Sequence, residues 1–563
     1  MKEISIRKKR GNRIFIGFII FLVVLVLAVQ LFLNRYLVSI VHKRLESLII
    51  KGSDSLYRFN DGKLSVNFLA GKVEVENLQI RVDSTHYKFL EKAKTLPALT
   101  VELDIPRVVV EGIDILPLLV SRRFKINKII TSDANVHLSR HFRNTDEETA
   151  QGEPLWKAIR NDIKQILIKK LLLDSVKISY TNADSARAFR WQFDNCSASL
   201  ENIRVDSIGQ TDSNRVMFTK NVAIIFNDVR LRTVDSLYRI TASKVFYTSE
   251  KRQLNVQQFA IEPSMNREGF YAKIGKQKDM LTLRIAKLDF NNFKLQRFIS
   301  NNELVADSAN ILNPEVSDYF DRTMPEIPEN KLGRYPPQLL LNAAISIRIK
   351  KINIEEGKLT YTELDNKTLG EGKIVISNIK GAIDNVTNNP SDIKINSECI
   401  ADLTGKALVS TIHAKFNFHL NGNDGGFSIA GNIKNVDGSQ LNSVTIPLAK
   451  TRIESFRMHE MEFTIEGNEQ MATGNMRMLY NDLRVQLNKE DAVTGGLKKS
   501  KFLTRLLARL TIRSDNPLGK EPEKIARDVK YVRDPHKAFF AIVWRTMFAC
   551  MQVIAMNIRG LTI

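Results

Sequence analysis

Apolar and polar side chains alternate with a period of two residues over most of the chain after Asp54. A period of two places successive apolar side chains on one face of an extended strand. The alternation is clearest at residues 64–68, 73–75, 78–82, 101–105, 245–247, 254–256 and 416–420. Asn421 to Gly426 then connects the last run to Phe427 and Ile429 and has the glycines of a hairpin loop. The pattern predicts a mainly β protein whose strands each have one apolar and one polar face.

Three stretches interrupt this alternation. An amphipathic helix is predicted over residues 151–173, where apolar residues keep helical spacing at Leu155, Ile159, Ile163, Ile166 and Leu167. Residues 300–337 contain prolines and asparagines and are interpreted as a connector, and a last apolar run follows Pro535. Strands and helices do not alternate regularly, so a doubly wound parallel sheet is not expected.

A short internal repeat accompanies the strands. IKKLLLDSVKISY at Ile168–Tyr180 aligns without gaps to IKKINIEEGKLTY at Ile349–Tyr361, and Lys125–Ser139 follows a similar pattern of strand, small or acidic turn and strand. One interpretation is a hairpin-like unit used several times along a sheet, and the other is chance similarity between alternating strands. The agreement of turn positions as well as apolar positions favours a true repeat.

The N-terminus has the pattern of a membrane anchor. Residues 14–33 are apolar except for Gln30, and about 20 such residues cross a ~30 Å hydrocarbon core as a helix. The run exceeds the apolar core of a signal peptide and ends at Asn34 and Arg35 without a cleavage site, which favours an uncleaved anchor. The basic residues before it keep the N-terminus cytoplasmic and place the bulk on the far side of the membrane. Residues 34–52 keep helical spacing, as either a juxtamembrane helix or a packed helix of the soluble part.

Composition and charge narrow the class. The chain has 563 residues, 43% of them hydrophobic, and a formal net charge of +21, which suits an ordinary globular protein with a basic surface. The basic clusters do not interleave with aromatic residues, so nucleic acid is not an expected partner. Cys196, Cys399 and Cys550 are far apart and form no CxxC pair, so neither a disulfide framework nor a zinc site is indicated.

Sequence signatures of catalysis are missing. The chain has no GxSxG elbow and no GxxxxGK[ST] phosphate loop, and HEMEF at His459–Phe463 lacks the second histidine of a zinc protease. His413 and His419 lie on one predicted strand, too far apart to share a metal ion directly. We therefore expect no enzyme activity, no cofactor and no metal site.

Several segments resemble a known family. Ser65–Val82, Leu99–Leu119 and Phe124–Arg140, following a basic tail and a single anchor, resemble the N-terminal region of AsmA-like proteins. Ser439–Leu487 is similar to the closing repeat of that family, and the segment from Asn516 to Phe548 resembles the tail of versions from Bacteroidetes-like bacteria. AsmA-like proteins belong to the bridge-like lipid-transfer superfamily. The resemblance implies a long, curved, antiparallel-type β-sheet groove anchored in the bacterial inner membrane, with its bulk in the periplasm.

These observations give one expected organisation of the chain. It comprises a cytoplasmic basic tail (1–13), a transmembrane helix (14–33), a juxtamembrane helix (34–52), an N-terminal AsmA-like β region (53–150), an amphipathic helical insert (151–173), a central β region (174–299), a connector (300–337), a C-terminal AsmA-like β region (338–495) and a basic tail with an amphipathic helix (496–563).

The expected function is transfer of phospholipid acyl chains along an apolar groove without making or breaking bonds. The candidate groove residues are Leu64, Val66, Phe68, Val73, Val75, Val101 and Leu103. Packing in a closed core is their alternative role. The expected partners are phospholipid, the inner membrane and assembly proteins of the outer membrane or periplasm. The alternative function is a closed, non-transporting scaffold that helps outer-membrane proteins to assemble.

The C-terminal apolar run also has two interpretations. Phe540, Val543, Met547, Met551 and Ile554 share one helical face. This face either meets lipid head groups as an interfacial helix or plugs the groove, or else it docks on the end of the sheet.

Overall fold

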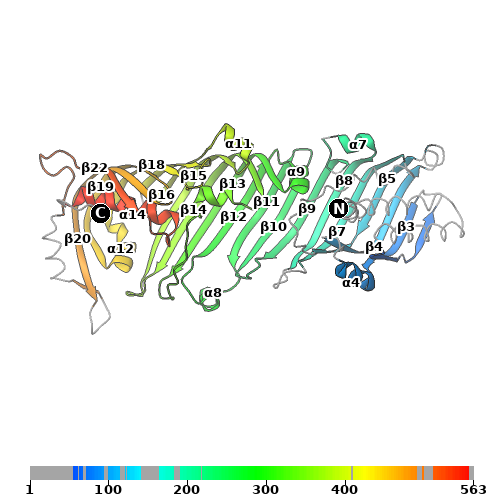
Figure 1. Cartoon of the computed structure of the whole chain (residues 1–563), viewed down its shortest axis with the longest axis horizontal. Helices are drawn as coiled ribbons and strands as arrows, with labels where there is room; N and C mark the ends of the chain where they lie inside the picture. Colours follow the sequence, from blue (N-terminus) through cyan, green and yellow to red (C-terminus); the bar gives the residue numbers. More distant parts are fainter. Residues whose placement is uncertain are drawn as a thin grey trace. The chain divides into compact units, whose positions relative to one another are not determined.

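The computed structural model describes most of the chain after residue 54 (Figure 1). The described ranges are 55–60, 62–67, 72–93, 99–114, 121, 123–140, 164–182, 190–212, 214–216, 218–407, 410–490, 497–499 and 512–556. The predicted transmembrane helix (14–33) and juxtamembrane helix (34–52) lie outside them. The chain divides into two compact units, one through Gln257 and one from Gln258. The boundary therefore falls inside the central β region that we expected as one block from 174 to 299.

Unit 1 is a mainly antiparallel ladder of strands. Its elements are β1 (Tyr57–Asn60), β2 (Leu64–Asn67), β3 (Lys72–Val82), α4 (Ser84–Lys92), β4 (Leu99–Asp114), β5 (Arg123–Ser132), β6 (Asn135–Arg140), β7 (Gln165–Asn182), β8 (Arg190–Val205), α7 (Ser207–Thr211), β9 (Thr219–Arg232) and β10 (Tyr238–Thr248). β1 and β2 pair with β3, β3 pairs with β4, and β4 pairs with both β5 and β6. β7 joins β5 and β6 in parallel, and β8, β9 and β10 follow antiparallel.

Unit 2 is also a mainly antiparallel ladder of strands. β11 (Gln253–Pro263) contains the boundary between the units. The later elements are α8 (Arg267–Ile274), β12 (Met280–Asn291), α9 (Leu295–Asn301), β13 (Glu303–Asp321), α10 (Pro336–Leu341), β14 (Ser346–Leu364), β15 (Glu371–Thr387), α11 (Pro390–Ile395), β16 (Glu398–Ala407), β17 (Ser410–His419), β18 (Phe427–Asp437), η1 (Gly438–Leu441), α12 (Asn442–Ala449), β19 (Thr451–Gly467), β20 (Met471–Glu490), β21 (Leu497–Lys499), β22 (Ile525–Val532) and α14 (Phe539–Ala555). β12 to β20 pair in chain order, with only β13 and β14 parallel, and β22 pairs with β20.

The mainly β fold class and the predicted strands are therefore confirmed for the described residues. The predicted hairpin is also confirmed, because β17 and β18 pair antiparallel with Phe418 opposite Phe427.

Two predicted interruptions are wrong where the structure describes them. The helix expected over 151–173 does not extend past residue 164, because β7 begins at Gln165. Ile166 and Ile168 are both buried on one face of that strand, which is a period of two rather than 3.6. The connector expected over 300–337 contains the 19-residue strand β13. Pro314 fits in β13 because it follows Asn313, which has a positive φ of 50° and locally distorts the strand.

The internal repeat is confirmed by topology. β7 contains the first repeat sequence and β14 the second, and each pairs in parallel with the preceding strands and antiparallel with the following one. A parallel pair requires a crossover connection of a dozen or more residues. The two connections, 141–164 and 322–345, are equally long.

Backbone irregularities recur at the same positions of the repeat. Ser175 in β7 and Glu356 in β14 occupy aligned positions and have φ values of 52° and 55°. A register shift of the following strand coincides with each of them. The turns expected inside the repeat are therefore bulges in continuous strands, and the unit is not a hairpin. One left-handed residue bends a strand without reversing it.

The ends of the next strands match as well. Asn202 in β8 and Asn385 in β15 both have positive φ, 55° and 58°. Four residues later, the side chains of Asp206 and Asn389 cap the N-termini of α7 and α11 by accepting backbone N–H groups. The two units thus contain copies of one supersecondary element.

Substitution of the bulge residue tests this description. Glu356 is an exposed non-glycine residue in the left-handed region, which costs roughly 1–2 kcal/mol. We expect Glu356→Gly to raise the free energy of unfolding by about 0.5–1 kcal/mol, as measured by urea denaturation. The matched control is Glu355→Gly, at an exposed neighbour without positive φ, which should lower it by about the same amount. Equal effects of the two substitutions would contradict the assigned bulge.

Candidate functional site: an apolar lane on unit 2

The strand registers of unit 2 align apolar side chains into rows. Residues directly opposite each other on paired strands point to the same face of a sheet. Starting from Phe290, successive partners across the strands are Ala309, Ile352, Ile383, Ala401, Phe416, Ile429, Ile465 and Gly474. Starting from Leu288, they are Ile311, Ile354, Gly381, Leu403, Ala414, Gly431, Phe463 and Met476. We call these two rows the apolar lane.

Most of the apolar lane between β12 and β17 is neither buried nor fully exposed. The side chains of Ile311, Ile354 and Leu403 are half-buried, as are those of Leu288, Ile352, Ile383 and Phe416. Large aliphatic side chains of a closed core are normally buried against several neighbours. This stretch of the lane therefore keeps apolar surface within reach of another apolar group.

The other end of the apolar lane is covered. Phe463, Ile465 and Met476 are buried in a core cluster together with Phe539 and Ile542 of α14. At Gly474 the helix is so close that a Cβ atom would stand 2.7 Å from Thr546 Cγ2 and 2.9 Å from Cys550 Sγ. The lane thus ends beneath α14, and this glycine is what permits the close approach.

Aromatic packing holds α14 at this end. The ring of Phe539 lies 4.9 Å from that of Phe427 and 5.1 Å from that of Tyr335, both in edge-to-face arrangements. The guanidinium group of Arg533 stacks on the ring of Tyr335, 4.0 Å from the ring centre. The first turn of α14 is therefore tied to β18 and to the segment that precedes α10.

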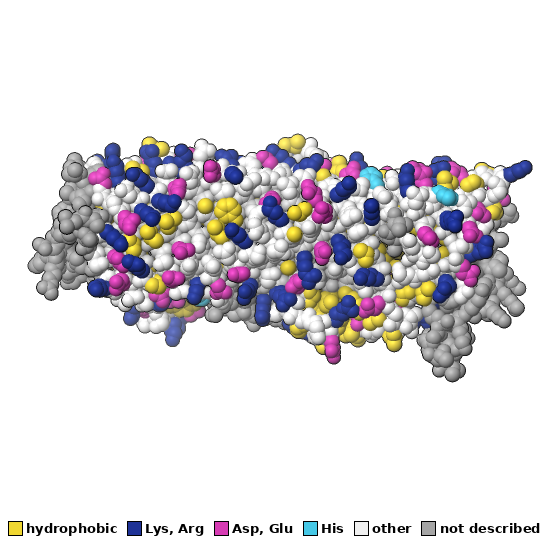
Figure 2. Space-filling view, turned by 180° about the vertical axis from the view of Figure 1, so that it is seen from behind, with side chains coloured by type: hydrophobic (Ala, Val, Ile, Leu, Met, Phe, Trp, Pro, Cys, Tyr) yellow, Lys and Arg dark blue, Asp and Glu magenta, His cyan; other side chains and the backbone are white. Residues whose placement is uncertain are grey.

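The opposite face of the same strands is charged. Glu355, Asp402 and Lys415 alternate with lane residues and are exposed. Cross-strand pairs join these charges, such as Lys351 with Asp384 at 3.5 Å and His413 with Asp402 at 2.7 Å. Figure 2 likewise shows basic and acidic side chains intermixed over one side of the molecule. Each strand is thus apolar on the lane side and polar on the other.

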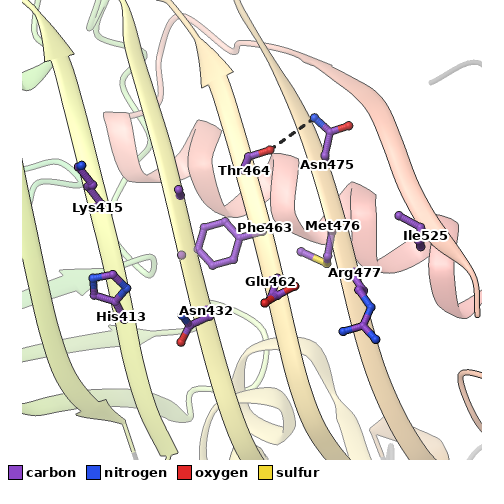
Figure 3. Close-up of a pocket in the computed structure, with 12 residues that line it drawn as sticks. His413, Lys415, Asn432, Glu462, Phe463, Thr464, Asn475, Met476, Arg477 and Ile525 are labelled. Atoms are coloured by element: carbon purple, nitrogen blue, oxygen red, sulfur yellow. Dashed lines mark hydrogen bonds between the residues drawn. The ribbon is translucent and has the colours of Figure 1, made fainter.

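A hollow of about 420 Å³, lined by both polar and apolar residues, lies on β17 to β20 and β22. Figure 3 shows the residues that line it on these strands, with α14 behind the strands. They include His413, Lys415, Asn432 and Glu462, and the amide of Asn475 donates a hydrogen bond to Thr464 Oγ1. Arg477, which also lines the hollow, is paired with Glu523 and Glu460. We assign no chemistry to the hollow.

Asp318 lies on the lane side of β13. Its strand partners are Leu281 and Tyr361, and it follows the apolar Val316, which is opposite Leu359. One carboxylate oxygen of Asp318 is buried without a hydrogen-bond partner. Burial, followed by repulsion from Asp279, raises the pKa of Asp318 to about 7, and Lys331 opposes this shift. Beside apolar surface, this carboxyl group is therefore largely protonated below neutral pH.

The candidate groove residues of unit 1 are buried where they are described. Val73, Val75, Val101 and Leu103 all belong to one core cluster and are 2–6% exposed. In the strand ladder, Leu64 is the partner of Val75 and Val66 is the partner of Val73. Phe68 lies outside the described residues. Sequence reasoning thus identified an apolar face, and Val73, Val75, Val101 and Leu103 are closed within a core there.

Most of the residues predicted to form an interfacial face of α14 lie on the side of the helix that packs against the sheet. Val543 and Ile554 are buried against the sheet, and Met547 and Met551 pack partly against the same cluster. Of the five predicted residues, only Phe540 is strongly exposed, at 66%. The correction has a simple reason: the face that best matches the apolar surface of β20 and β22 is buried there.

Sequence reasoning placed Phe416 and Ile429 on predicted strands but did not identify the lane between β12 and β15. Ile311 and Ile354 lie in strands that were interpreted as a connector or seen only as part of the repeat. The alternation of Ile352 with Ile354, and of Leu288 with Phe290, was a readable signal. Their alignment into rows depends on register, which no single strand reveals.

Comparison with protein-family models finds no match to the chain, and comparison with curated proteins finds none either. Within the described ranges, no helix combines the length and apolar character needed to span a membrane. Within the same ranges, no group of three or more histidine, cysteine or acidic side chains is arranged to hold a metal ion.

Titration of Asp318 gives a testable pH dependence. Its pKa is about 7 in the folded chain and 3.8 for an ordinary aspartate, so the folded state binds the extra proton between these values. Stability should therefore fall as pH rises from about 4 to 7 and then level off. We expect Asp318→Asn to raise the free energy of unfolding at pH 8 by on the order of 2 kcal/mol and to have little effect at pH 4.

Denaturant titrations of both proteins across this pH range check the prediction. Asp402→Asn, at an exposed position on the opposite face, serves as the control. A gain for Asp318→Asn that is independent of pH would contradict the burial mechanism.

Proposed function

We propose that the chain is a membrane-anchored protein of the bacterial envelope that carries phospholipid acyl chains along the apolar lane. The supporting observation is the half-exposed stretch of the lane from β12 to β17. In this proposal the N-terminal segment 14–33 holds the chain in the inner membrane and the β units lie in the periplasm. The long curved groove implied by the resemblance to AsmA-like proteins is part of the same proposal.

The hydrophobic effect supplies the binding free energy. Transfer of an acyl chain from water to apolar side chains gains about 0.8 kcal/mol per buried CH₂ group. The six strands from β12 to β17 are spaced about 4.8 Å apart, so the half-exposed stretch is about 24 Å long. One leaflet of a bilayer contributes about 15 Å to a ~30 Å hydrocarbon core, so the stretch accommodates the tails of one phospholipid.

Both rows of the lane consist of uncharged residues, and this favours movement over storage. Adjacent positions along it have similar apolar side chains, so an acyl chain that slides by one strand exchanges one set of contacts for an equivalent set. The absence of charged side chains from both rows means that no ion pair has to break during the movement. Head groups would remain in water beside the sheet.

A non-transporting scaffold is the second candidate. The burial of Val73, Val75, Val101 and Leu103 favours it, because a sheet whose apolar face is closed by its own side chains has no room for a lipid. Such a protein would assist the assembly of outer-membrane proteins through its surface. The two candidates differ in whether acyl chains contact the apolar lane.

Photo-crosslinking at adjacent residues separates the candidates. A benzoylphenylalanine at Ile354 points into the lane, whereas one at Glu355 points to the charged face. In cells labelled with radioactive fatty acid, we expect crosslinked lipid from position 354 and only background from position 355. Mass spectrometry of the purified adduct identifies the lipid.

A charged substitution provides a second measurement. We expect Ile354→Asp to reduce the phospholipid that copurifies with the full chain by about tenfold, since burying a carboxylate beside acyl chains is costly. Glu355→Asp on the other face should leave it unchanged. A chain that is free of lipid and gives no adduct at position 354 would favour the scaffold.

A further inference from the structure

The outward face of α14 is strongly apolar. Phe540, Trp544 and Phe548 follow each other at intervals of four residues, and their side chains are 66%, 56% and 42% exposed. The rings of Trp544 and Phe548 stack with their centres 6.3 Å apart. Three aromatic residues thus form a continuous exposed row, which we call the aromatic stripe.

The aromatic stripe is separate from the face that packs on the sheet. Phe539, Ile542, Thr546 and Cys550 fill the docked side of the helix. Surface helices of globular proteins normally turn polar residues outward. Between Ala538 and Met556 only Arg545 is charged, and it is exposed beside the stripe. The fold of unit 2 does not require three large aromatic rings on this outward side.

The size of the stripe argues against a second protein chain. A helix of 17 residues is about 25 Å long and its outward face is about 10 Å wide, so it offers on the order of 250 Å². Stable protein interfaces bury about 800 Å² on each partner. A bilayer surface needs no matching shape and accepts a single helix lying in its plane.

The chemistry of the stripe suits an anionic lipid surface. Tryptophan and other aromatic side chains favour the region between head groups and acyl chains. Arg545 can reach acidic head groups from the N-terminal half of the helix, and the helix dipole adds positive charge at the same end. Lys537 lies just before the helix and is 52% exposed, where it pairs with the exposed Glu326 at 3.2 Å.

We propose that α14 docks unit 2 on the surface of a bilayer that contains anionic phospholipid, with the aromatic stripe inserted at the level of the head groups. This docking goes beyond carriage of acyl chains and does not depend on it. It would place the covered end of the apolar lane next to a membrane.

Vesicle binding by the full chain tests the proposal. The chain is held in nanodiscs of neutral phosphatidylcholine, which provide a bilayer for the apolar segment 14–33. Vesicles of phosphatidylethanolamine with phosphatidylglycerol are then added. We expect the triple variant Phe540→Ser, Trp544→Ser and Phe548→Ser to bind these vesicles roughly a hundredfold more weakly than the unchanged protein.

The matched control removes equally exposed apolar side chains elsewhere. Phe89→Ser, Leu369→Ser and Ile395→Ser change residues that are 66%, 70% and 88% exposed, and this variant should bind like the unchanged protein. Equal binding by the two triple variants would overturn the proposal. The proposal would also be overturned if the unchanged protein did not bind the vesicles, whether or not it associated with itself through α14.

Contact of the stripe with lipid is measured directly by fluorescence. Brominated phospholipid in the added vesicles should quench the unchanged protein more than the Trp544→Phe variant, because the difference reports Trp544 alone. Equal quenching would overturn the proposal even if a triple variant folded poorly. Ile354→Asp should still bind vesicles, so failure of the lane and failure of the docking are distinguishable.

Discussion

Backbone hydrogen bonding between neighbouring strands is the interaction on which the rest of this structure depends. It fixes which residues lie opposite each other, and because side chains alternate between faces, a slip of one residue would turn every apolar side chain of a strand to the charged side. In unit 2 the registers hold from β12 to β20, and the rows that begin at Leu288 and Phe290 are continuous as a result. The lane is a property of the pairing and not of any one strand.

Bulges adjust this pairing without breaking it. The apolar side chains of β14 are Ile352 and Ile354 before Glu356, and Leu359 and Tyr361 after it. In a regular strand these two pairs would point to opposite faces of the sheet. The extra residue restores them to one face. Asn313 accompanies this change in the neighbouring strand β13. Strands of 17 to 20 residues such as β14, β15 and β20 can therefore keep one apolar side while the sheet twists.

Local sequence predicted the class of the fold and much of its detail. Alternation identified the strands around Val73, Val101 and Phe416, and the glycine-rich loop before Phe427 identified a hairpin. The two errors, at residues 165–173 and 303–321, adjoin the two crossovers that lead into parallel strands. Proline and asparagine in β13 and mixed spacing in the first half of β7 have the local chemistry of loops and helices, and only the long-range partners of these segments make them strands. The same limit applies to the site, because exposure of Ile354 or Trp544 depends on what packs nearby.

The matched positions of Ser175 and Glu356, and of the caps Asp206 and Asn389, have an evolutionary consequence. A module that contains its own kink, its own helix cap and its own crossover can be duplicated as a whole. Proteins built from this module can therefore gain or lose whole copies, so gene duplication changes the number of their strands in discrete steps.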